Sequence, residues 1–224
     1  MSGRKYTVAR IPGDCIGPEV IREASAILEA TGEKHGFSIS WADYPFGADY
    51  YTRTGEILPS AAVEEMASMD ALFLGAVGDP RVKPGILERG ILLHLRFHFD
   101  QYVNLRPAKS YPRVPLPVRP KKREDLDTLV VRENTEDFYM GIGGTTKNGR
   151  AAIDMSAVRG LYTIKGKLEG EFSGSVEGAF QLGVASEPGI RRVVAYGCRA
   201  AKSRGEETIT LASKSNALPQ IYGF

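Results

Sequence analysis

The chain has 224 residues, of which 42% are apolar and 25% are charged, so it can bury a sizeable core in one large domain or two smaller ones. Its formal net charge is only +2, and the basic residues at 119–123 are followed at once by Glu124, Asp125 and Asp127, which favours a solvated loop and no nucleic-acid partner. No apolar run approaches the roughly 20 residues that span a bilayer, so we expect no membrane segment.

The first part of the chain predicts a strand, a turn and a helix. Residues 5–11 are typical of a strand, and a turn over 12–17 leads into a helix that begins at Pro18. We expect this helix to end at Gly32, where glycine can adopt the left-handed conformation. Its apolar residues recur at helical spacing and predict one buried face, formed by Val20, Ile21, Ala24, Ile27 and Leu28.

Strands and helices continue to alternate in the next hundred residues. The apolar run 71–77 does not alternate with polar residues, which favours a strand buried on both faces. The other elements that we expect are a strand at 37–44, a helix at 59–69, a helix at 87–99, an extended segment at 102–106 and a short buried strand at 129–132. This order predicts an α/β fold with a parallel or mixed sheet flanked by helices.

The stretch from Gly141 to Gly183 is rich in glycine and favours the hairpins of an arm, although a mobile surface excursion fits its composition equally well. A hairpin alone is marginally stable in water, so we expect the arm to dock on the body or on a second subunit.

A helix is predicted from Pro188 to Gly205. Its expected apolar face comprises Ile190, Val193, Val194, Gly197, Cys198 and Ala201, and its basic residues, Arg192 among them, lie largely elsewhere. A strand at 208–212 should then deliver Ser213, Lys214, Ser215 and Asn216 at its end, where α/β sheets commonly place functional groups.

Three arginines next to apolar segments suggest a pocket for a carboxylated metabolite. Arg96 and Arg106 flank an amphipathic stretch, and Arg132 follows the apolar pair Val130-Val131. Guanidinium groups match carboxylate oxygens with a rigid fork of donors and stay charged at physiological pH. For any single arginine, a salt bridge or an exposed position is the ordinary alternative.

The two cysteines, Cys15 and Cys198, lie far apart in the sequence and form no Cys-x-x-Cys pair. No charged-then-apolar signal segment opens the chain. A reducing cytoplasm is therefore the expected location.

Five motifs together resemble the β-decarboxylating dehydrogenases, the family of the isopropylmalate, isocitrate, homoisocitrate and tartrate/malate enzymes. They lie at residues 11–20 (IPGDCIGPEV), 73–78 (FLGAVG), 99–107 (FDQYVNLRP), 131–136 (VRENTE) and 214–216 (KSN). The resemblance implies an isopropylmalate-dehydrogenase-like α/β fold with a protruding β arm at about 141–187. Residues 1–98 would be the amino-terminal part of the large domain, and residues 99–224 the central substrate and dimerisation domain.

The resemblance also implies roles for particular residues. Arg96, Arg106 and Arg132 would grip the carboxylates of a 2-hydroxy diacid, and Tyr139 would protonate the enol after carbon dioxide leaves. Lys214 would reach into the site of a neighbouring subunit and help to remove the hydroxyl proton, which implies a homodimer through the arm. Ile11 and Asn216 would contact NAD. A divalent ion, magnesium or manganese, would stabilise the alkoxide and the enolate.

The sequence also departs from the family. Cys15 replaces the glycine usual in the first motif, and the arm is longer and richer in glycine than the usual clasp. The carboxy-terminal part of the family pattern, with the metal-binding aspartates and the adenine-side loop, is absent from these 224 residues. We therefore assign no metal ligand in this chain.

The segment before Arg96 reduces the number of candidate substrates. Leu92 and Leu93 stand where isocitrate enzymes carry polar residues facing the third carboxylate, and an apolar pocket disfavours that buried charge. The isopropylmalate and tartrate/malate types both remain open, and ordinary helix packing explains the two leucines equally well. The main hypothesis is NAD-dependent oxidative decarboxylation of a 2-hydroxy dicarboxylic acid, with the family's missing part required. The alternative is a non-catalytic module that binds a diacid or mediates dimerisation.

Overall fold

A computed structural model describes residues 3–118, 126–146, 149–173 and 177–224. The chain divides into two compact units, Met1–Phe99 and Asp100–Phe224, which we describe separately. The basic cluster at 119–123, predicted as a loop, lies outside the described residues.

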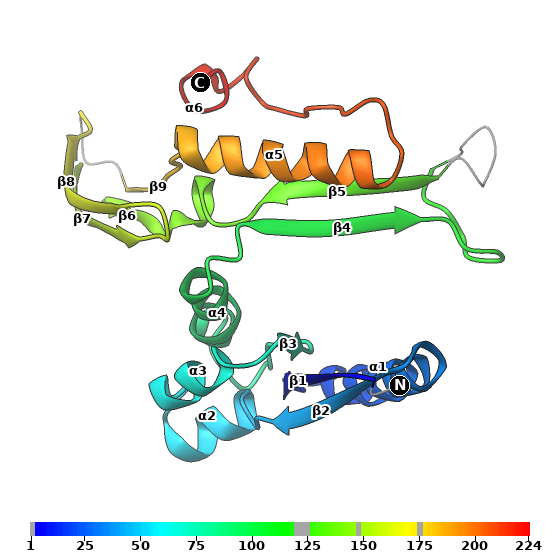
Figure 1. Ribbon diagram of the computed structural model, residues 1–224. Coiled ribbons are helices and arrows are strands. Elements are labelled where there is room, and N and C mark those ends of the chain that lie inside the picture. Colours follow the sequence, from blue (N-terminus) through cyan, green and yellow to red (C-terminus); the bar gives the residue numbers. More distant parts are fainter. Residues whose placement is uncertain (1–2, 119–125, 147–148, 174–176) are drawn as a thin grey trace. The chain divides into compact units, whose positions relative to one another are not determined.

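The first unit is built on a parallel sheet. Strand β1 (Arg4–Ile11) lies between β2 (Phe37–Asp43) and β3 (Ala71–Leu74), and both neighbours run parallel to it (Figure 1). Parallel neighbours require crossover connections, which helices supply here. These are α1 (Gly17–His35) between β1 and β2, and α2 (Ala48–Thr54) and α3 (Ser60–Met66) between β2 and β3. The predicted α/β class with a parallel sheet is confirmed.

Helix α1 differs from its prediction in length and in its buried face. It continues to His35, and Gly36, with φ 76°, caps it in place of Gly32. A Cβ on Gly32 would lie 2.6 Å from the carbonyl oxygen of Phe37, so this glycine permits close packing inside the helix. The buried residues are Gly17, Ile21, Ser25 and Gly32, whereas Val20 and Ile27 are 54% and 67% exposed.

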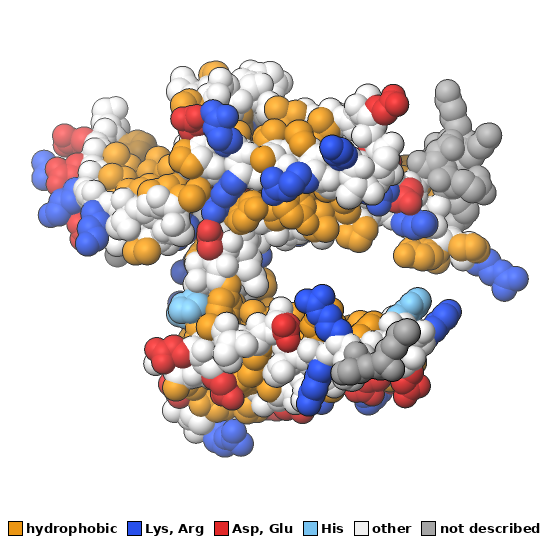
Figure 2. All heavy atoms as spheres, in the orientation of Figure 1, with side chains coloured by type: hydrophobic (Ala, Val, Ile, Leu, Met, Phe, Trp, Pro, Cys, Tyr) orange, Lys and Arg blue, Asp and Glu red, His pale blue; other side chains and the backbone are white. Residues whose placement is uncertain are grey.

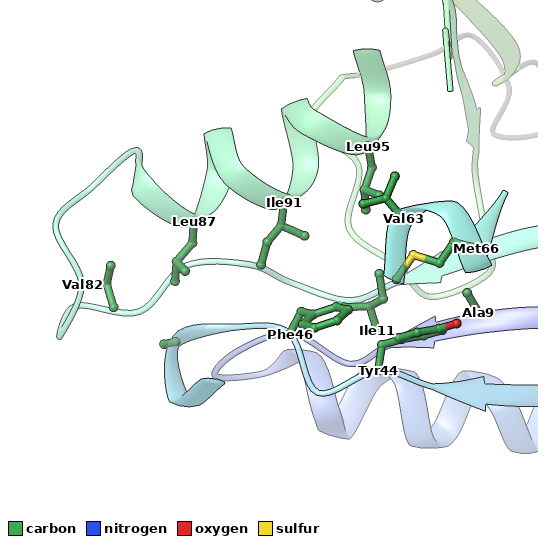
Figure 3. Packing of buried hydrophobic residues seen from close by; sticks show 11 residues of the cluster. Ala9, Ile11, Tyr44, Phe46, Val63, Met66, Val82, Leu87, Ile91 and Leu95 are labelled. Atoms are coloured by element: carbon green, nitrogen blue, oxygen red, sulfur yellow. The ribbon is translucent and has the colours of Figure 1, made fainter. Parts of the chain in front are cut away.

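The core of the first unit is a cluster of buried apolar side chains that come from the sheet, its loops and its helices. Ile11, Phe46 and Met66 pack there with Leu87 and Ile91 (Figure 3). Ile91 belongs to the π-helix η1 (Glu88–Leu93), and Leu87 is the residue that caps the start of η1. Helix α4 (His94–His98) continues this helical stretch, which lies close to the helix expected at 87–99.

Strand β3 is shorter and more exposed than predicted. It ends at Leu74, Ala71 is exposed, and the other three residues are only partly buried. Within the described residues β3 pairs with β1 alone, so it is an edge strand. The uninterrupted apolar run therefore did not indicate burial on both faces.

The second unit begins with a ribbon of β4 (Val103–Lys109) and β5 (Asp127–Glu133), which are antiparallel. Helix α5 (Glu187–Ser203) packs along β5, and a short helix, α6 (Pro219–Tyr222), follows near the end of the chain (Figure 1). Strand β5 was predicted to be buried, but Val130 is 47% exposed, since the helix covers one face of the ribbon. On α5, Val194 and Cys198 are exposed, in contrast to the predicted apolar face.

The arm consists of two antiparallel strand pairs, as expected for hairpins. Strand β6 (Ile142–Thr146) pairs with β9 (Gly178–Leu182), and β7 (Arg150–Val158) pairs with β8 (Thr163–Glu171). Met140, Ile142 and Ala157 form a small buried cluster beneath them. The arm therefore has its own apolar core in addition to its backbone pairing.

The strand predicted at 208–212 is wrong. These residues are exposed and form no strand, and Ile209 and Leu211 are 57% and 80% exposed. A strand needs a neighbour for its N–H and C=O groups. No described strand pairs with this segment, so β-propensity alone did not produce one.

Candidate functional site

The ribbon β4–β5 brings two of the predicted arginines onto one face. Asn104 lies opposite Arg132, and Arg106 lies opposite Val130. Because side chains alternate along a strand, residues 104 and 106 of β4 and residues 130 and 132 of β5 share a face. The two guanidinium groups therefore start from diagonal positions of the same ribbon face, within reach of one small dianion.

Neutral side chains hold Arg106 in place. Its Nε donates to Asn104 Oδ1 at 2.9 Å, and Asn104 Nδ2 donates to Asn134 Oδ1 at 3.3 Å. Asn134 is buried and donates in turn to the carbonyl oxygen of Gln101 at 3.0 Å. Among the described residues, neither Arg106 nor Arg132 forms an ion pair. Their charges are therefore not neutralised by a carboxylate of the described chain, which suits a site for an anion.

Tyr139 lies against Arg132. It belongs to the 3₁₀ helix η3 (Asp137–Met140), and its ring centre is 4.7 Å from the guanidinium carbon of Arg132. This cation–π contact links the predicted proton donor to a predicted carboxylate ligand. Tyr139 remains 43% exposed, so a ligand can approach it.

The turn between Arg132 and Tyr139 is fixed by Glu133. Its carboxylate accepts hydrogen bonds from Thr135 N at 2.9 Å, Thr135 Oγ1 at 2.8 Å and Glu136 N at 2.8 Å. Carboxylate acceptors of this kind satisfy backbone donors that would otherwise be orphaned in a turn. Glu133 therefore fixes the conformation of the turn that leads from Arg132 to Tyr139.

Glu136 ties the base of the arm to the start of α5. Its side chain, in a residue only 3% exposed, accepts from Tyr162 Oη at 2.8 Å, Ser186 N at 2.9 Å and Ser186 Oγ at 2.5 Å. Burial, and then the hydrogen bond to Glu136, raise the pKa of Tyr162. Burial also lowers the pKa of Arg159, whose Nε donates to the carbonyl oxygen of Thr135 at 2.8 Å.

Arg192 of α5 joins the same network of hydrogen bonds through Thr135. Arg192 donates to the two carboxylate oxygens of Asp100 at 2.6 and 3.1 Å, and also to Thr135 Oγ1 at 3.1 Å. It lies 4.3 Å above the ring of Tyr102. The sequence pattern places Arg192 off the apolar face of this helix and predicts no role for Glu136 or Asp100. The dense polar run at 133–137 was the available signal for a buried network.

Lys214 and Asn216 lie in an exposed turn. The carbonyl oxygen of Lys214 accepts from Ala217 N at 3.0 Å and Leu218 N at 2.9 Å, and both side chains are exposed. The expected strand that would have presented them is missing, as described above. Their roles stay predictions.

Two further predicted residues belong to the first unit. Arg96 is buried in α4 at 9% exposure, and its convergence with Arg106 and Arg132 stays a prediction. Ile11 is fully buried, and its carbonyl oxygen accepts from Gly75 N at 2.9 Å. A cofactor contact at Ile11 would therefore have to use the main chain.

Asp14 joins three loops at the carboxyl edge of the parallel sheet. Its buried carboxylate accepts from Ala48 N at 2.6 Å and Gly78 N at 2.9 Å, and its own N–H donates to Ala76 O at 2.7 Å. Gly13 has φ 75°, and a Cβ there would lie 2.0 Å from Ala76 O. The first motif thus serves backbone geometry, in a region of the sheet where α/β proteins commonly bind ligands.

In the parts of the chain that the structure describes, no three His, Cys, Asp or Glu side chains are grouped to hold a metal ion. None of the described helices has the length and apolar character to cross a bilayer. An open hollow of about 560 Å³ lies on α5, but its lining contains none of the predicted site residues: Glu187, Ile190, Arg191, Val194, Ala195 and Phe224.

Comparisons with known proteins agree on one family. The sequence model of the isocitrate/isopropylmalate dehydrogenase family matches residues 7–224. A 3-isopropylmalate dehydrogenase of Thermobifida fusca is 42% identical over 97% of this chain and 55% of its own. A D-malate dehydrogenase [decarboxylating] of Escherichia coli is 36% identical over 94% of this chain and 52% of its own.

The structural comparison agrees. A crystal structure of isocitrate dehydrogenase from Methylococcus capsulatus superposes with a TM-score of 0.74 at 25% identity, over 97% of this chain and 54% of the other. The chain thus spans about half the length of the curated relatives it matches.

Proposed function

Because the chain belongs to the isocitrate/isopropylmalate dehydrogenase family, we propose that it carries the diacid-binding part of an NAD-dependent decarboxylating dehydrogenase. The substrate would be a 2-hydroxy dicarboxylic acid of the isopropylmalate or tartrate/malate type. The relatives named above include both a 3-isopropylmalate and a D-malate enzyme, which supports this class. Full activity would require the part of the family pattern that these residues lack.

One observation supports the proposal most strongly. Arg106 and Arg132 share a ribbon face and make no ion pair among the described residues, and the ring of Tyr139 lies against Arg132. A dicarboxylate bound on this face would receive charge-assisted hydrogen bonds from both guanidinium groups. Its second carbon would then be fixed, which lowers the entropic cost of a later reaction.

The proposed chemistry assigns one task to each residue. Arg106 and Arg132, with Arg96 from the first unit, would hold the carboxylates. Lys214, supplied to the site of a second subunit, would help to take the proton of the hydroxyl group, and NAD would accept the hydride from C2. After carbon dioxide leaves, the Tyr139 phenol would donate its proton to the enol carbon. The phenolate would be stabilised by the adjacent Arg132 charge.

The described residues offer polar groups to NAD but no cluster of three ligands to a metal ion. The exposed Asn216 amide offers a donor and an acceptor to NAD, and Ile11 offers its main chain. Magnesium or manganese needs several oxygen ligands, and the described residues provide no cluster of three. The proposed chemistry therefore assigns no step to a metal ion held by these residues.

A second candidate is a module that binds a diacid or forms a dimer without catalysing a reaction. The exposed position of Lys214 in a turn favours it, since a proton-transfer group is ordinarily held in place. The enzyme and a diacid-binding module both predict diacid binding, and turnover separates them, whereas a module that only dimerises predicts no diacid binding.

Calorimetric titration with D-malate and with isopropylmalate tests the binding directly. We expect the Arg106→Ala variant to lose affinity, and Arg199→Ala, an exposed arginine of α5, to bind as the parent chain does. NADH formation with NAD and Mg²⁺ present would then decide for the enzyme. The absence of diacid binding by the parent chain would refute the diacid-binding enzyme and the diacid-binding module, and would leave only a module that dimerises.

A further inference from the structure

Helix α4 carries two of the chain's three histidines, His94 and His98, one helical turn apart. Residues four apart on an α-helix lie side by side on one face, with their Cβ atoms about 5–6 Å apart. Neither histidine has a task in the proposed function. The pair therefore has no explanation in the binding of a diacid or of NAD.

The local helix geometry produces this alignment. The preceding element, η1, is a π-helix with wider turns, and regular α-helical geometry begins at His94. Phe99 N donates to Leu95 O at 3.0 Å, which keeps the four-residue spacing to the end of α4. If the π-helical spacing continued, residues four apart would not lie directly above one another. Both histidines thus fall within a regular α-helical turn.

The core of the first unit fixes which face of α4 meets solvent. Leu95 is 3% exposed and belongs to the core cluster, and Arg96 is also buried, whereas His94 and His98 are exposed. Histidine side chains come to the surface over α4 in the space-filling view (Figure 2). A dissolved ion can therefore reach both imidazoles without displacing a residue of the core.

The two imidazole rings already lie side by side. Their centres are 6.1 Å apart, and the ring planes are inclined by 11°. The ring of His98 also meets the ring of Phe99 edge to face, with the centres 4.9 Å apart. These contacts restrict the side chains before any ligand arrives, so less conformational entropy is lost when one ion binds both rings.

The ring nitrogens are available to a ligand. Among the residues that the structure describes, no ion pair or hydrogen bond engages either imidazole. Imidazole nitrogens bind a divalent metal at about 2.0–2.1 Å, which places two ring centres about 5 Å apart around one ion. The separation of 6.1 Å must shorten by only about 1 Å, and rotation of two exposed side chains supplies this change.

We propose that His94 and His98 form a two-ligand site for a divalent transition-metal ion of the Zn²⁺, Ni²⁺ and Cu²⁺ class. Water would fill the remaining coordination positions, because the described parts of the chain group no third His, Cys, Asp or Glu with this pair. Imidazole nitrogen suits these ions, whereas magnesium and manganese prefer oxygen ligands. The ion differs in class from the magnesium or manganese that the family resemblance implies, and the inference does not depend on the proposed function.

A bound ion would cross-link one turn of a short helix. Helix α4 spans only His94–His98, and Arg96 lies two residues from each histidine, on the opposite side of the helix. The ion therefore leaves that side of α4 unoccupied. Short helices are marginally stable by themselves, so an ion that binds the folded turn stabilises the segment that holds Arg96. Zn²⁺ should accordingly raise the midpoint of thermal unfolding.

Isothermal titration calorimetry with Zn²⁺, Ni²⁺ and Cu²⁺ measures the site in a chain without an affinity tag. The reference chain carries Cys15→Ser and Cys198→Ser, because exposed thiols bind the same ions. We expect one ion per chain, with Cu²⁺ bound more tightly than Ni²⁺ or Zn²⁺. An excess of Mg²⁺ should not compete.

Substitutions identify the two ligands. His94→Gln and His98→Gln should each weaken binding on the order of 100-fold, because the second imidazole of a chelate acts at a high effective concentration. His98→Cys should restore tight Zn²⁺ binding, because a thiolate is a zinc ligand. His35→Gln is the matched control, because it removes an exposed histidine at the end of α1, and it should bind as the reference chain does.

Electron paramagnetic resonance of bound Cu²⁺ reports the ligands directly. The spectrum should show coupling to two imidazole nitrogens in the reference chain and to one in each glutamine variant. This readout is separate from affinity, so it distinguishes a lost ligand from a change elsewhere in the chain.

Two solvated histidines without a ligand are the ordinary alternative. Absence of Zn²⁺ binding by the reference chain, unchanged affinity in either glutamine variant, an equal loss in His35→Gln, or displacement of the ion by Mg²⁺ would overturn the inference. These measurements contain no diacid. Failure of the metal site therefore leaves the proposed function standing, and loss of diacid binding leaves the metal site standing.

Discussion

Replacing Glu136 by glutamine should loosen the connection between the arm and α5. The carboxylate sits in a residue that is 3% exposed and receives three hydrogen bonds, from Tyr162 Oη and from the N–H and hydroxyl of Ser186. The glutamine amide keeps the shape but turns one acceptor oxygen into a donor. One of the three donors would then face another donor in a buried place.

The magnitude follows from these contacts. A hydrogen bond to a charged group contributes about 1.5–3 kcal/mol, and a buried donor left without an acceptor costs about 1–3 kcal/mol. We expect Glu136→Gln to lower the free energy of unfolding by about 3 kcal/mol and Tyr162→Phe, which removes one bond, by about 1.5 kcal/mol. The double variant should lose about 1 kcal/mol less than the sum, because both changes remove the same bond.

Urea unfolding followed by far-UV circular dichroism measures these differences at pH 7. Glu207→Gln is the matched control, because this glutamate is exposed after α5, and it should change stability by less than about 0.5 kcal/mol. An equally small loss for Glu136→Gln, or strict additivity with Tyr162→Phe, would show that the network does not hold the arm.

Three more changes test the first motif and the end of the chain. Gly13→Ala should destabilise by at least about 3 kcal/mol in thermal unfolding, whereas Gly36→Ala, at a similar φ but in open space, should cost about 1 kcal/mol, and equal losses would exclude the close approach to Ala76 as the cause. Asp14→Asn should lower the urea midpoint by an amount equivalent to about 2 kcal/mol, since one of its two loop contacts loses a proper acceptor, and an unchanged midpoint would contradict the clamp. The hydrogen bond to Asp137 and burial raise the pKa of Tyr222 to about 12, so its docking contribution is present below pH 10 and is lost as the pH rises through 12. Ultraviolet titration should show this ionisation moving to lower pH in Asp137→Asn, and no movement would remove Asp137 as its cause.

The sequence predicted those parts of the fold that depend on local pattern. The parallel strands around β1, helix α5 and the hairpins of the arm follow from apolar periodicity and from turn residues. The buried face of α1 did not follow, because Ser25 is buried where Arg10 donates to its hydroxyl at 3.3 Å. A pattern of apolar residues cannot report a face built from small and polar residues.

In the site, too, features that depend on local pattern could be predicted and features that depend on long-range contacts could not. Alternation along β4 and β5 was enough to place Arg106 and Arg132 on one ribbon face once their pairing was known, but the register of that pairing is a long-range property. Glu136, Tyr162 and Ser186 come from three separate segments, and their contact depends on how the arm returns to α5. The segment 208–212 has strand composition but lacks a described neighbour, so its pattern was misleading.

The central claim is that Arg106 and Arg132 together hold a dicarboxylate. Calorimetry of isopropylmalate and D-malate binding to the parent chain, to Arg106→Ala, to Arg132→Ala and to the double variant tests it most directly. We predict that each single change weakens binding by about 10- to 100-fold, and that the double change costs less than the product, since one ligand joins both groups. Affinity that survives both substitutions unchanged would contradict the account.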